Sequence, residues 1–431
     1  MIYWAQLFHF YQPATQLPSV LDKICDESYS PLINVFREFP NVRVTVNINA
    51  ILTEMLSHCG HHDIIQGLKE LGQKGQIEFV GSAKYHPILP LIPPNEGKRQ
   101  MELNYKTNSF FFGDTYKPAG FFPPEMAYSR DIVTGVIGTG HQWIILGGIA
   151  CPIDWPVDKV YQVEHDGQRL ALFFRDDLLS NKISFQEVGP KDFLENLNAL
   201  KGDRENIYVV TAMDAETYGH HVKDWEELFL SEVYEEIQVR SETYAHIKQK
   251  TMLAERQSNL IRDEETSQRV NAVTISQLLE HFPLGEVVDP KPSSWSTSTQ
   301  DIDAGNSFPL WKDKDNEIHR IQWEHMAICM ELCSKAVQVA DNNESKRFAG
   351  IARGLLDRAQ QSDQFWWASR RPMWDINLIH MGLIDQWRVT LNAYRAINKS
   401  GCEGDVKKQF FDKLTVAREI RSKILDQLFV L

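Results

Sequence analysis

The sequence predicts an α/β protein in which a β/α barrel is followed by a C-terminal α-helical bundle. Three observations support this prediction. Short apolar runs recur through the first half of the chain, helical patterns lie between several of them, and from about residue 315 only helical periodicity remains. Nearly continuous apolar runs indicate strands that are covered on both faces, as in a parallel sheet. Strands that alternate with helices are typical of β/α architectures.

Seven runs carry the strand pattern. They are IYWAQLF (2–8), VRVTVNI (42–48), IEFVG (77–81), AGFFP (119–123), WIILG (143–147), LALFF (170–174) and IYVVTAM (207–213). Seven or eight parallel strands can close into a barrel whose chemistry lies at the carboxyl ends of the strands. The residues that directly follow each run are therefore the first candidates for a functional site.

The segments between these runs show helical spacing. Apolar residues recur at helical intervals in SPLINVFREF (30–39) and in HDIIQGLKELGQKG (62–75), and Gly75 is suited to the position just beyond a helix. Thr274 and Gln277 have the spacing of a capping box at the start of another helix. These segments supply the helices that a β/α barrel requires.

The second part of the chain has a different character. Four long segments after residue 315 show helical periodicity, and the segment 285–314 before them is rich in Pro, Gly, Ser and Asp. We therefore predict a catalytic barrel over 1–290, and over 291–431 a Trp-bearing junction with a helical domain packed on the barrel. A charged helical hairpin is also predicted over 224–258.

Composition excludes several classes of partner. The chain has 431 residues, a net charge of −13 and six cysteines without C-x-x-C spacing. An acidic protein is a poor match for nucleic acid or anionic membrane, and no apolar run reaches the length of a membrane span. The N-terminal segment lacks the features of a signal peptide. We expect a cytoplasmic protein with reduced thiols and a neutral or small substrate; a homo-oligomer stays open.

Polar side chains follow four of the predicted strands. The candidate site residues are His9, Tyr11, Gln12, Tyr85, His86, Glu125, Tyr128, Asp214, Glu216, His220 and His221. In a barrel these strand ends converge, so Glu125 and Asp214 would bring two carboxyl groups into one cleft. Paired carboxyl groups with separated pKa values are the equipment of glycoside hydrolysis. Trp295 and Trp311 lie in the polar junction, and we expect at least one of them to stack on a sugar ring.

The three candidate acids also have ordinary structural interpretations. Glu125 follows two prolines and can simply begin a helix, and Asp214 can cap one. Glu216 can hold its own loop in place. The cluster HCGHH (58–62) lacks the spacing of a metal site, so we expect a turn between helices and no metal there.

Four segments resemble, in order, the signature regions of glycoside hydrolase family 57. They are HFYQP (9–13), GQIEFVGSAKYHPILPL (75–91), GFFPPEMAYS (120–129) and AMDAETYGHH (212–221). One such segment alone is not specific, whereas four in this order are. The resemblance spans roughly residues 1–295, and the C-terminal part resembles the family only in being helical.

The resemblance implies an incomplete (β/α)7 barrel and a retaining enzyme that acts on α-glucans or α-galactosides without a nucleotide cofactor. Members include α-amylases, 4-α-glucanotransferases, amylopullulanases, branching enzymes and α-galactosidases. By position, Glu125 corresponds to the nucleophile and Asp214 to the general acid/base. Tyr11 stands where many members have a second histidine, and Phe122 where tryptophan is usual, so the resemblance leaves sugar specificity and the choice between hydrolysis and transfer open.

Two other functions remain open from the sequence. One is a zinc-dependent enzyme on a similar barrel, such as a polysaccharide deacetylase or an α-mannosidase-like hydrolase, although His9 has no adjacent aspartate and no second histidine two residues on. The other is a glucan-binding relative without activity. Both candidate carboxyl groups are present in the sequence, which favours an active enzyme.

Overall fold

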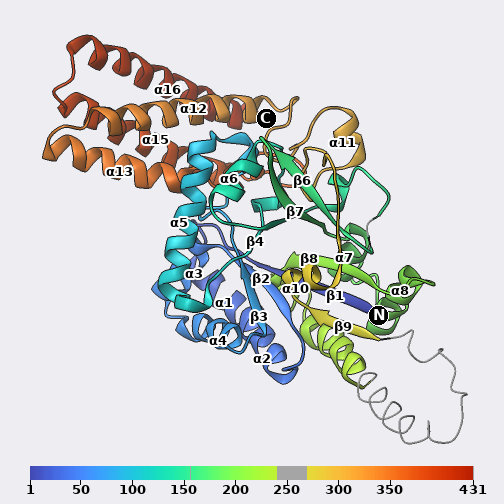
Figure 1. The fold of residues 1–431 in the computed structure, drawn as a ribbon. Coiled ribbons are helices and arrows are strands. Elements are labelled where there is room, and N and C mark those ends of the chain that lie inside the picture. The colour runs from blue at the N-terminus through green and yellow to red at the C-terminus, as the bar shows by residue number, and fades with distance from the viewer. Residues whose placement is uncertain (156, 240–268, 431) are drawn as a thin grey trace, which may run out of the picture. The chain divides into compact units, whose positions relative to one another are not determined.

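The computed structural model in Figure 1 describes residues 1–155, 157–239 and 269–430. The chain forms two compact units. The first, here called the barrel unit, comprises residues 1–84 and 93–295, and the second, the helical unit, comprises residues 85–92 and 296–431. The chain therefore enters the helical unit twice, first for the short segment 85–92 and finally after Trp295.

The barrel unit contains two five-stranded sheets. The first has the order β3-β2-β1-β8 with β9 also paired to β1, and the second has the order β10-β6-β7-β5-β4. The strands are β1 (Ile2–Phe10), β2 (Val44–Ile48), β3 (Ile77–Val80), β4 (Gly120–Phe121), β5 (Trp143–Leu146), β6 (Val160–His165), β7 (Gln168–Phe174), β8 (Ile207–Asp214), β9 (Val270–Val273) and β10 (Leu284–Val287).

Backbone contacts connect the two sheets at both sides. Gly81, just after β3, forms a parallel bridge with Phe121 of β4. The amide of Asp176, just after β7, donates to the carbonyl of Val210 in β8 over 2.7 Å. Within the described residues, the parallel strands thus form a ring of β1, β2, β3, β4, β5, β7 and β8. Between β3 and β4 and between β7 and β8, the ring is joined by isolated contacts and not by continuous strand pairing. This confirms the predicted incomplete (β/α)7 barrel.

The seven predicted strands all exist, with ends that differ by a few residues, but three others were not predicted. The strand β6 runs antiparallel to β7, and the two meet at Asp166 and Gly167, both with positive φ. Such a two-residue Asp-Gly turn is a strong hairpin signal. The short strand β9 adds to the same edge of β1 as β2, beside its first residues.

Helices cover the strands of the barrel unit (Figure 1). The α-helices are α1 (Pro18–Ile24), α2 (Ser30–Glu38), α3 (Ala50–Cys59), α4 (His62–Gln73), α5 (Pro94–Phe112), α6 (Ile132–Gly138), α7 (Asp177–Ser184), α8 (Pro190–Lys201) and α10 (Ile275–His281). Gly75 follows α4 with a φ of 68°, and the capping box of Thr274 and Gln277 is present. Both predictions are confirmed. The predicted hairpin 224–258 is helical up to residue 239, and its remainder lies outside the described residues.

The alternation of β1 decides which side chains face the inside of the barrel. Trp4 and Phe8 point outward into a core shared with α1–α4. Ala5 and Leu7 point inward and pack with residues of β5, β7 and β8. Because successive side chains of a strand point to opposite faces, His9 continues the inward row at the carboxyl end of the strand.

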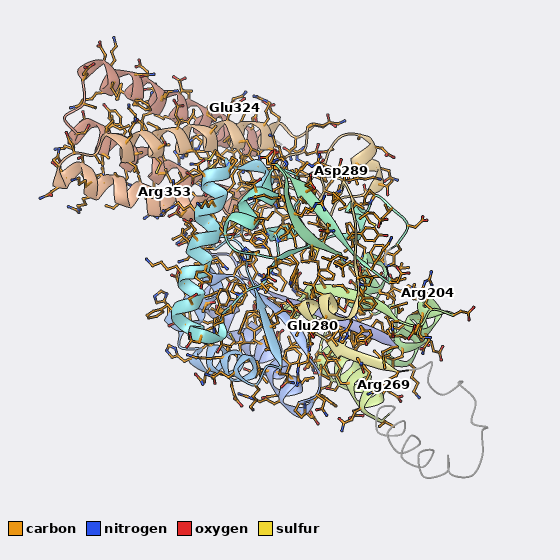
Figure 2. The ribbon with its side chains drawn as sticks, in the orientation of Figure 1. Arg204, Arg269, Glu280, Asp289, Glu324 and Arg353 are labelled. Atoms are coloured by element: carbon orange, nitrogen blue, oxygen red, sulfur yellow. The ribbon has the colours of Figure 1, made fainter. Side chains whose placement is uncertain are left out.

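The helical unit confirms the predicted bundle. Its α-helices are α11 (Thr299–Asp303), α12 (Glu317–Val339), α13 (Asn343–Ala359), α14 (Asp363–Trp366), α15 (Ile376–Lys399) and α16 (Gly404–Val430). Ion pairs at helical spacing support α12 and α13, where Glu324 pairs with Arg320 and Arg353 pairs with Asp357. Figure 2 labels Glu324 and Arg353 on these helices. In the parts of the chain that the structure describes, no helix combines the length and hydropathy needed to cross a bilayer.

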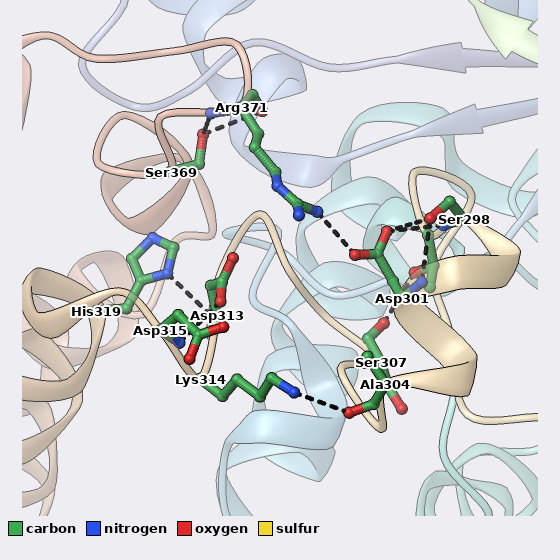
Figure 3. Close-up of polar contacts among 11 residues, drawn as sticks. Ser298, Asp301, Ala304, Ser307, Asp313, Lys314, Asp315, His319, Ser369 and Arg371 are labelled. Atoms are coloured by element: carbon green, nitrogen blue, oxygen red, sulfur yellow. Dashed lines mark hydrogen bonds and ion pairs between the residues drawn. The ribbon is translucent and has the colours of Figure 1, made fainter.

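The polar segment before α12 is fixed by specific contacts within the helical unit (Figure 3). Asp301 and Ser298 form a capping box at the start of α11. The carboxylate of Asp301 also forms an ion pair with Arg371 at 2.7 Å. Further along, the backbone amide of Asp313 donates to Nδ1 of His319 at 3.0 Å. A segment that looks like a flexible linker in sequence is therefore an ordered part of this unit.

Candidate active site

Three inward-pointing polar residues lie side by side at the carboxyl ends of β2, β1 and β8. His9 pairs in register with Asn47 on one side and with Asp214 on the other. The Nδ1 atom of His9 donates to Oδ1 of Asn47 over 2.6 Å. His9 is only 3% exposed, and burial lowers its pKa while Asp214 and Asn47 oppose this change. The barrel register thus brings a buried imidazole next to the predicted acid/base.

The environment of Asp214 favours its protonated form. Burial raises the pKa of its carboxyl group, and the charges of His9 and Arg175 oppose this rise. Asp214 also occupies the position before the short helix η6 (Ala215–Thr217), but its side chain makes no capping hydrogen bond. The helix-capping alternative therefore does not explain this side chain.

Glu125 has an unusual backbone conformation. It lies in the short helix η4 (Pro124–Met126), directly after β4 and two prolines, with φ 59° and ψ 17°. The next residue, Met126, also has a positive φ. A residue other than glycine in this region costs of the order of 1 kcal/mol or more and persists where surrounding structure enforces it, which is common at functional sites.

Trp295, the last residue of the barrel unit, forms hydrogen bonds with both the backbone and the side chain of Glu125. Its amide donates to the Glu125 carbonyl over 3.1 Å, and its indole Nε1 donates to Oε2 of Glu125 over 2.8 Å. Two residues earlier, Ser293 pairs with the backbone of Tyr128 in both directions. The segment 293–295 therefore runs antiparallel to 125–128 and fixes the direction of the Glu125 carboxylate.

Aromatic rings connect the two carboxyl groups. The ring of His9 stacks on Phe122 at a centroid distance of 4.6 Å and meets Trp295 edge-on at 5.9 Å. The ring of Tyr11 also stacks with that of His9, at a centroid distance of 5.9 Å. Glu125 thus contacts Trp295, Trp295 contacts His9, and His9 lies beside Asp214. The predicted strand-end residues of β1, β4 and β8 do come together.

Arg175 belongs to the same cluster and was not predicted from the sequence. It follows the last residue of β7 and is 5% exposed. Its guanidinium lies 5.9 Å from the centroid of the Trp295 ring, and its Nε donates to the carbonyl of Ala212 in β8 over 2.7 Å. The signal was available, since Arg175 directly follows LALFF just as Asp214 follows its own strand.

Glu216 is a buried acid in the turn that follows Asp214. It is 3% exposed, and its Oε1 accepts hydrogen bonds from the Nε2 of Gln12 at 2.8 Å and from the hydroxyl of Tyr29. Burial, followed by the charge of Asp214, raises its pKa to about 8, although both donors oppose this. The carboxyl group contacts protein, which fits the alternative that Glu216 holds its own loop.

The loop after β8 is held by the π-helical segment η1 (Cys25–Tyr29). Besides Tyr29, Ser28 donates to the carbonyl of Ala215 at 2.9 Å, and Glu27 pairs with Nδ1 of His220 at 2.6 Å. Three consecutive residues therefore bind this loop. No local pattern in the sequence predicts these contacts, which join residues nearly 190 positions apart.

Glycine is required at position 219 of this loop. Gly219 has a φ of 99°, and a Cβ there would lie 1.7 Å from the carbonyl oxygen of Glu27. His221, two residues further on, is exposed, and its ring lies 5.5 Å from that of His220. Of the two predicted histidines, His220 thus contacts protein and His221 faces outward.

Tyr85 and His86 are not among the residues of the barrel unit, because both belong to the helical unit. His86 is buried, has a φ of 56°, and places Nδ1 3.0 Å from the hydroxyl of Ser362. Its carbonyl accepts from the amide of Ser362. Their role as substrate contacts stays a prediction.

Two of the aromatic residues expected to contact substrate are buried. Trp311, a residue of the helical unit, is 1% exposed in the chain, and its carbonyl accepts from the indole of Trp323 at 2.8 Å. A ring without an exposed face offers no surface on which a sugar can stack, so burial does not favour this role for Trp311, which stays a prediction. Tyr128 is also completely buried, and burial raises its pKa. Trp295 is the half-buried tryptophan of the pair.

No metal-binding group emerges from residues 1–155, 157–239 and 269–430. Among them, no set of three or more His, Cys, Asp and Glu side chains is arranged to hold an ion. The cluster 58–62 forms the turn between α3 and α4, with Gly60 at a φ of 92°, as predicted. In this turn His61 pairs with Asp22 at 2.7 Å.

The sequence matches the model of "Glycosyl hydrolase family 57" over residues 6–267. An α-amylase of Pyrococcus horikoshii is 28% identical over 219 residues, which are 49% of this chain and 33% of the relative. A 4-α-glucanotransferase of Thermococcus kodakarensis is 25% identical over 391 residues, which are 83% of this chain and 53% of the relative. The chain thus spans between a third and about half the length of these curated relatives.

Solved structures share the fold at low sequence identity. A GH57-type branching enzyme from Pyrococcus horikoshii superimposes with a TM-score of 0.69 at 15% identity, covering 97% of this chain and 94% of that one. A 4-α-glucanotransferase from Thermococcus litoralis gives a TM-score of 0.64 at 19% identity, with 92% and 59% covered. At these identities the likeness supports the architecture alone.

Proposed function

Because this chain belongs to glycosyl hydrolase family 57, we propose that it is a retaining glycoside hydrolase that cleaves α-1,4-linked glucan by double displacement. Glu125 is the nucleophile and Asp214 the general acid/base of this proposal. The observation that carries it is the connection of these two carboxyl groups, from different strand ends, through Trp295 and His9. Paired carboxyl groups flanking one bond are the requirement of this chemistry.

In the first step, protonated Asp214 donates its proton to the glycosidic oxygen while Glu125 attacks the anomeric carbon. The bond between that carbon and the leaving oxygen breaks, and a covalent β-glycosyl ester with Glu125 forms. The raised pKa of Asp214 supports its role as the proton donor, because the acid must be protonated when substrate binds. The bond from Trp295 aims Oε2 of Glu125.

In the second step, Asp214 is the base. It takes a proton from water, whose oxygen attacks the anomeric carbon and releases Glu125 with the α configuration restored. This mechanism requires carboxyl groups roughly 5–5.5 Å apart. Half-buried Tyr11 and Trp295 are suited to contact the sugar, since aromatic faces pack against the apolar faces of pyranose rings.

Transfer to a second sugar is the runner-up reaction. It differs only in the acceptor, a sugar hydroxyl instead of water. The relative that covers 83% of this chain is named a 4-α-glucanotransferase, and the branching enzyme shares the fold over 97% of it. These names favour transfer as the second candidate, with the same two carboxyl groups in the same roles.

Incubation with maltoheptaose tests the proposal. Hydrolysis yields only shorter oligosaccharides, whereas transfer also yields longer ones. Wild-type protein that leaves maltoheptaose unchanged would refute the proposed hydrolysis and point instead to branching, to galactoside substrates or to an inactive relative. Glu125→Gln and Asp214→Asn should each lower turnover by at least about 10³-fold. The matched controls are Glu102→Gln and Asp203→Asn, both at exposed positions, which should retain full activity.

A further inference from the structure

Arg175 is the buried cation that contacts both sides of the candidate site. Its Nη1 donates to Oδ1 of Asp177 at 2.7 Å and its Nη2 to Oδ1 of Asn181 at 3.0 Å, while Nε donates to Ala212. A buried guanidinium is costly unless it is paired and hydrogen-bonded. Because three of its nitrogens donate to acceptors in α7 and β8, the planar guanidinium of Arg175 has a fixed orientation.

One face of this fixed group lies near Trp295. The distance from the guanidinium carbon of Arg175 to the Trp295 ring centroid is 5.9 Å, within the range of a cation–π interaction. The indole Nε1 of the same residue donates the hydrogen bond to Oε2 of Glu125. The Trp295 ring therefore contacts both the guanidinium of Arg175 and the carboxylate of Glu125.

The other connection of Arg175 leads to Asp214. Ala212, whose carbonyl accepts from Nε, lies two residues before Asp214 in β8. The charged or titratable groups that act on Asp214 are His9 from β1, Arg175 from the end of β7, and Glu216 in the following turn. Among these three, Arg175 supplies the permanent positive charge, since a guanidinium does not deprotonate in proteins.

We infer that Arg175 is a positioning residue that couples the two carboxyl groups: it orients Trp295, and thereby Glu125, and sets the positive charge beside Asp214. This inference rests on the roles of Glu125 and Asp214 in the proposed function. Two consecutive glycines, Gly147 and Gly148, approach the backbones of these residues. A Cβ on Gly148 would lie 2.7 Å from the carbonyl oxygen of Arg175, and a Cβ on Gly147 would lie 3.3 Å from Cα of Trp295. The loop after β5 thus lies close to the backbones of both residues.

The test compares Arg175→Met with Arg169→Met. Arg169 lies near the other end of β7, is exposed, and pairs with Glu164 at 2.7 Å. The two variants therefore change the net charge equally at positions near opposite ends of the same strand. Two spectroscopic readouts need no turnover: the indole N–H signal of Trp295, assigned with Trp295→Phe, and the titration of the Asp214 carboxyl carbon, assigned with Asp214→Asn in protein labelled at aspartate.

In Arg175→Met we expect the Trp295 signal to shift and Asp214 to titrate at higher pH, because a nearby positive charge that favours the carboxylate is gone. In Arg169→Met both should match the wild type. With maltoheptaose, Arg175→Met should lower kcat by about 100-fold, as a misplaced catalytic group does, and move the basic limb of the kcat/KM profile to higher pH.

Arg175→Lys separates the two roles, since lysine keeps the charge and loses the planar fork. It should shift the Trp295 signal while Asp214 titrates nearly as in the wild type. If Arg175→Met does not fold, Arg175→Gln replaces it. Unchanged Trp295 and Asp214 signals in the charge-removing variant would overturn the inference. Wild-type protein without glucan turnover would instead refute the proposed function, while the two spectroscopic readouts would still decide the role of Arg175.

Discussion

Replacing Glu216 with glutamine should remove a large pH dependence from the stability of this protein. Both hydrogen bonds to this carboxyl group, from Gln12 and from Tyr29, end on the same oxygen, Oε1. Glutamine offers an amide oxygen in that place and an NH2 group in place of the second oxygen. The variant therefore imitates the neutral, protonated acid with its two donors still bound.

The magnitude follows from the pKa of Glu216. In the folded protein it is raised to about 8 from an ordinary value of 4.5, so between these pH values the folded state binds a proton that the unfolded chain has lost. Stability from this group is then greatest below pH 4.5 and falls as the pH rises to about 8. At 1.36 kcal/mol per pKa unit, the loss is at most about 5 kcal/mol.

Urea unfolding of the wild type and of Glu216→Gln, followed by circular dichroism from pH 5 to pH 8.5, measures this difference. Titrations of groups that do not interact with Glu216 cancel when the two proteins are compared, provided that their m values agree. The titration of Asp214, whose charge acts on Glu216, belongs to the measured difference. We expect the variant to gain on the wild type steadily as the pH rises. A free-energy difference that stays constant across this range would show that Glu216 titrates normally, and the account of its buried site would fail.

Three further substitutions test individual contacts. Trp295→Phe removes the N–H that binds Oε2 of Glu125, so kcat/KM for maltoheptaose should fall by about tenfold to hundredfold, as for hydrogen bonds to charged groups, with an unchanged melting temperature. Gly219→Ala places a Cβ against the carbonyl of Glu27 at a positive φ and should lower the unfolding free energy by about 1–3 kcal/mol, measured by thermal unfolding. Trp311→Phe thins a buried core and should cost about 1–3 kcal/mol of stability; a raised KM would instead indicate that Trp311 binds sugar.

The sequence was sufficient to predict the barrel because its strands are covered on both faces. The runs that became β1 and β8 are almost continuously apolar, and their register alone puts His9 beside Asp214. The strand β10 gave no such signal, because Leu284–Val287 is alternately exposed and half-buried. The segment 85–92 could not be assigned to the second unit either, since only tertiary contacts such as that of His86 with Ser362 reveal it.

The candidate site was predictable where a polar residue ends an apolar strand, and less so elsewhere. His9, Glu125 and Asp214 all carry that signal, and Arg175 carries it too, although its role depends on contacts with Trp295 that follow from folding. Tyr29 lies in a helical turn that shows no local sign of a distant acid. Trp311 is enclosed, which a polar surrounding sequence does not reveal.

The double entry of the chain into the helical unit has a practical consequence for anyone who wishes to produce the barrel as a fragment. A stop codon after Trp295 would remove residues 296–431 but leave 85–92 behind. His86 would then lose the hydroxyl and amide of Ser362, and a buried imidazole would face solvent. An autonomous barrel therefore calls for a second edit, in which a short polar bridge replaces the stretch between Lys84 and Pro93.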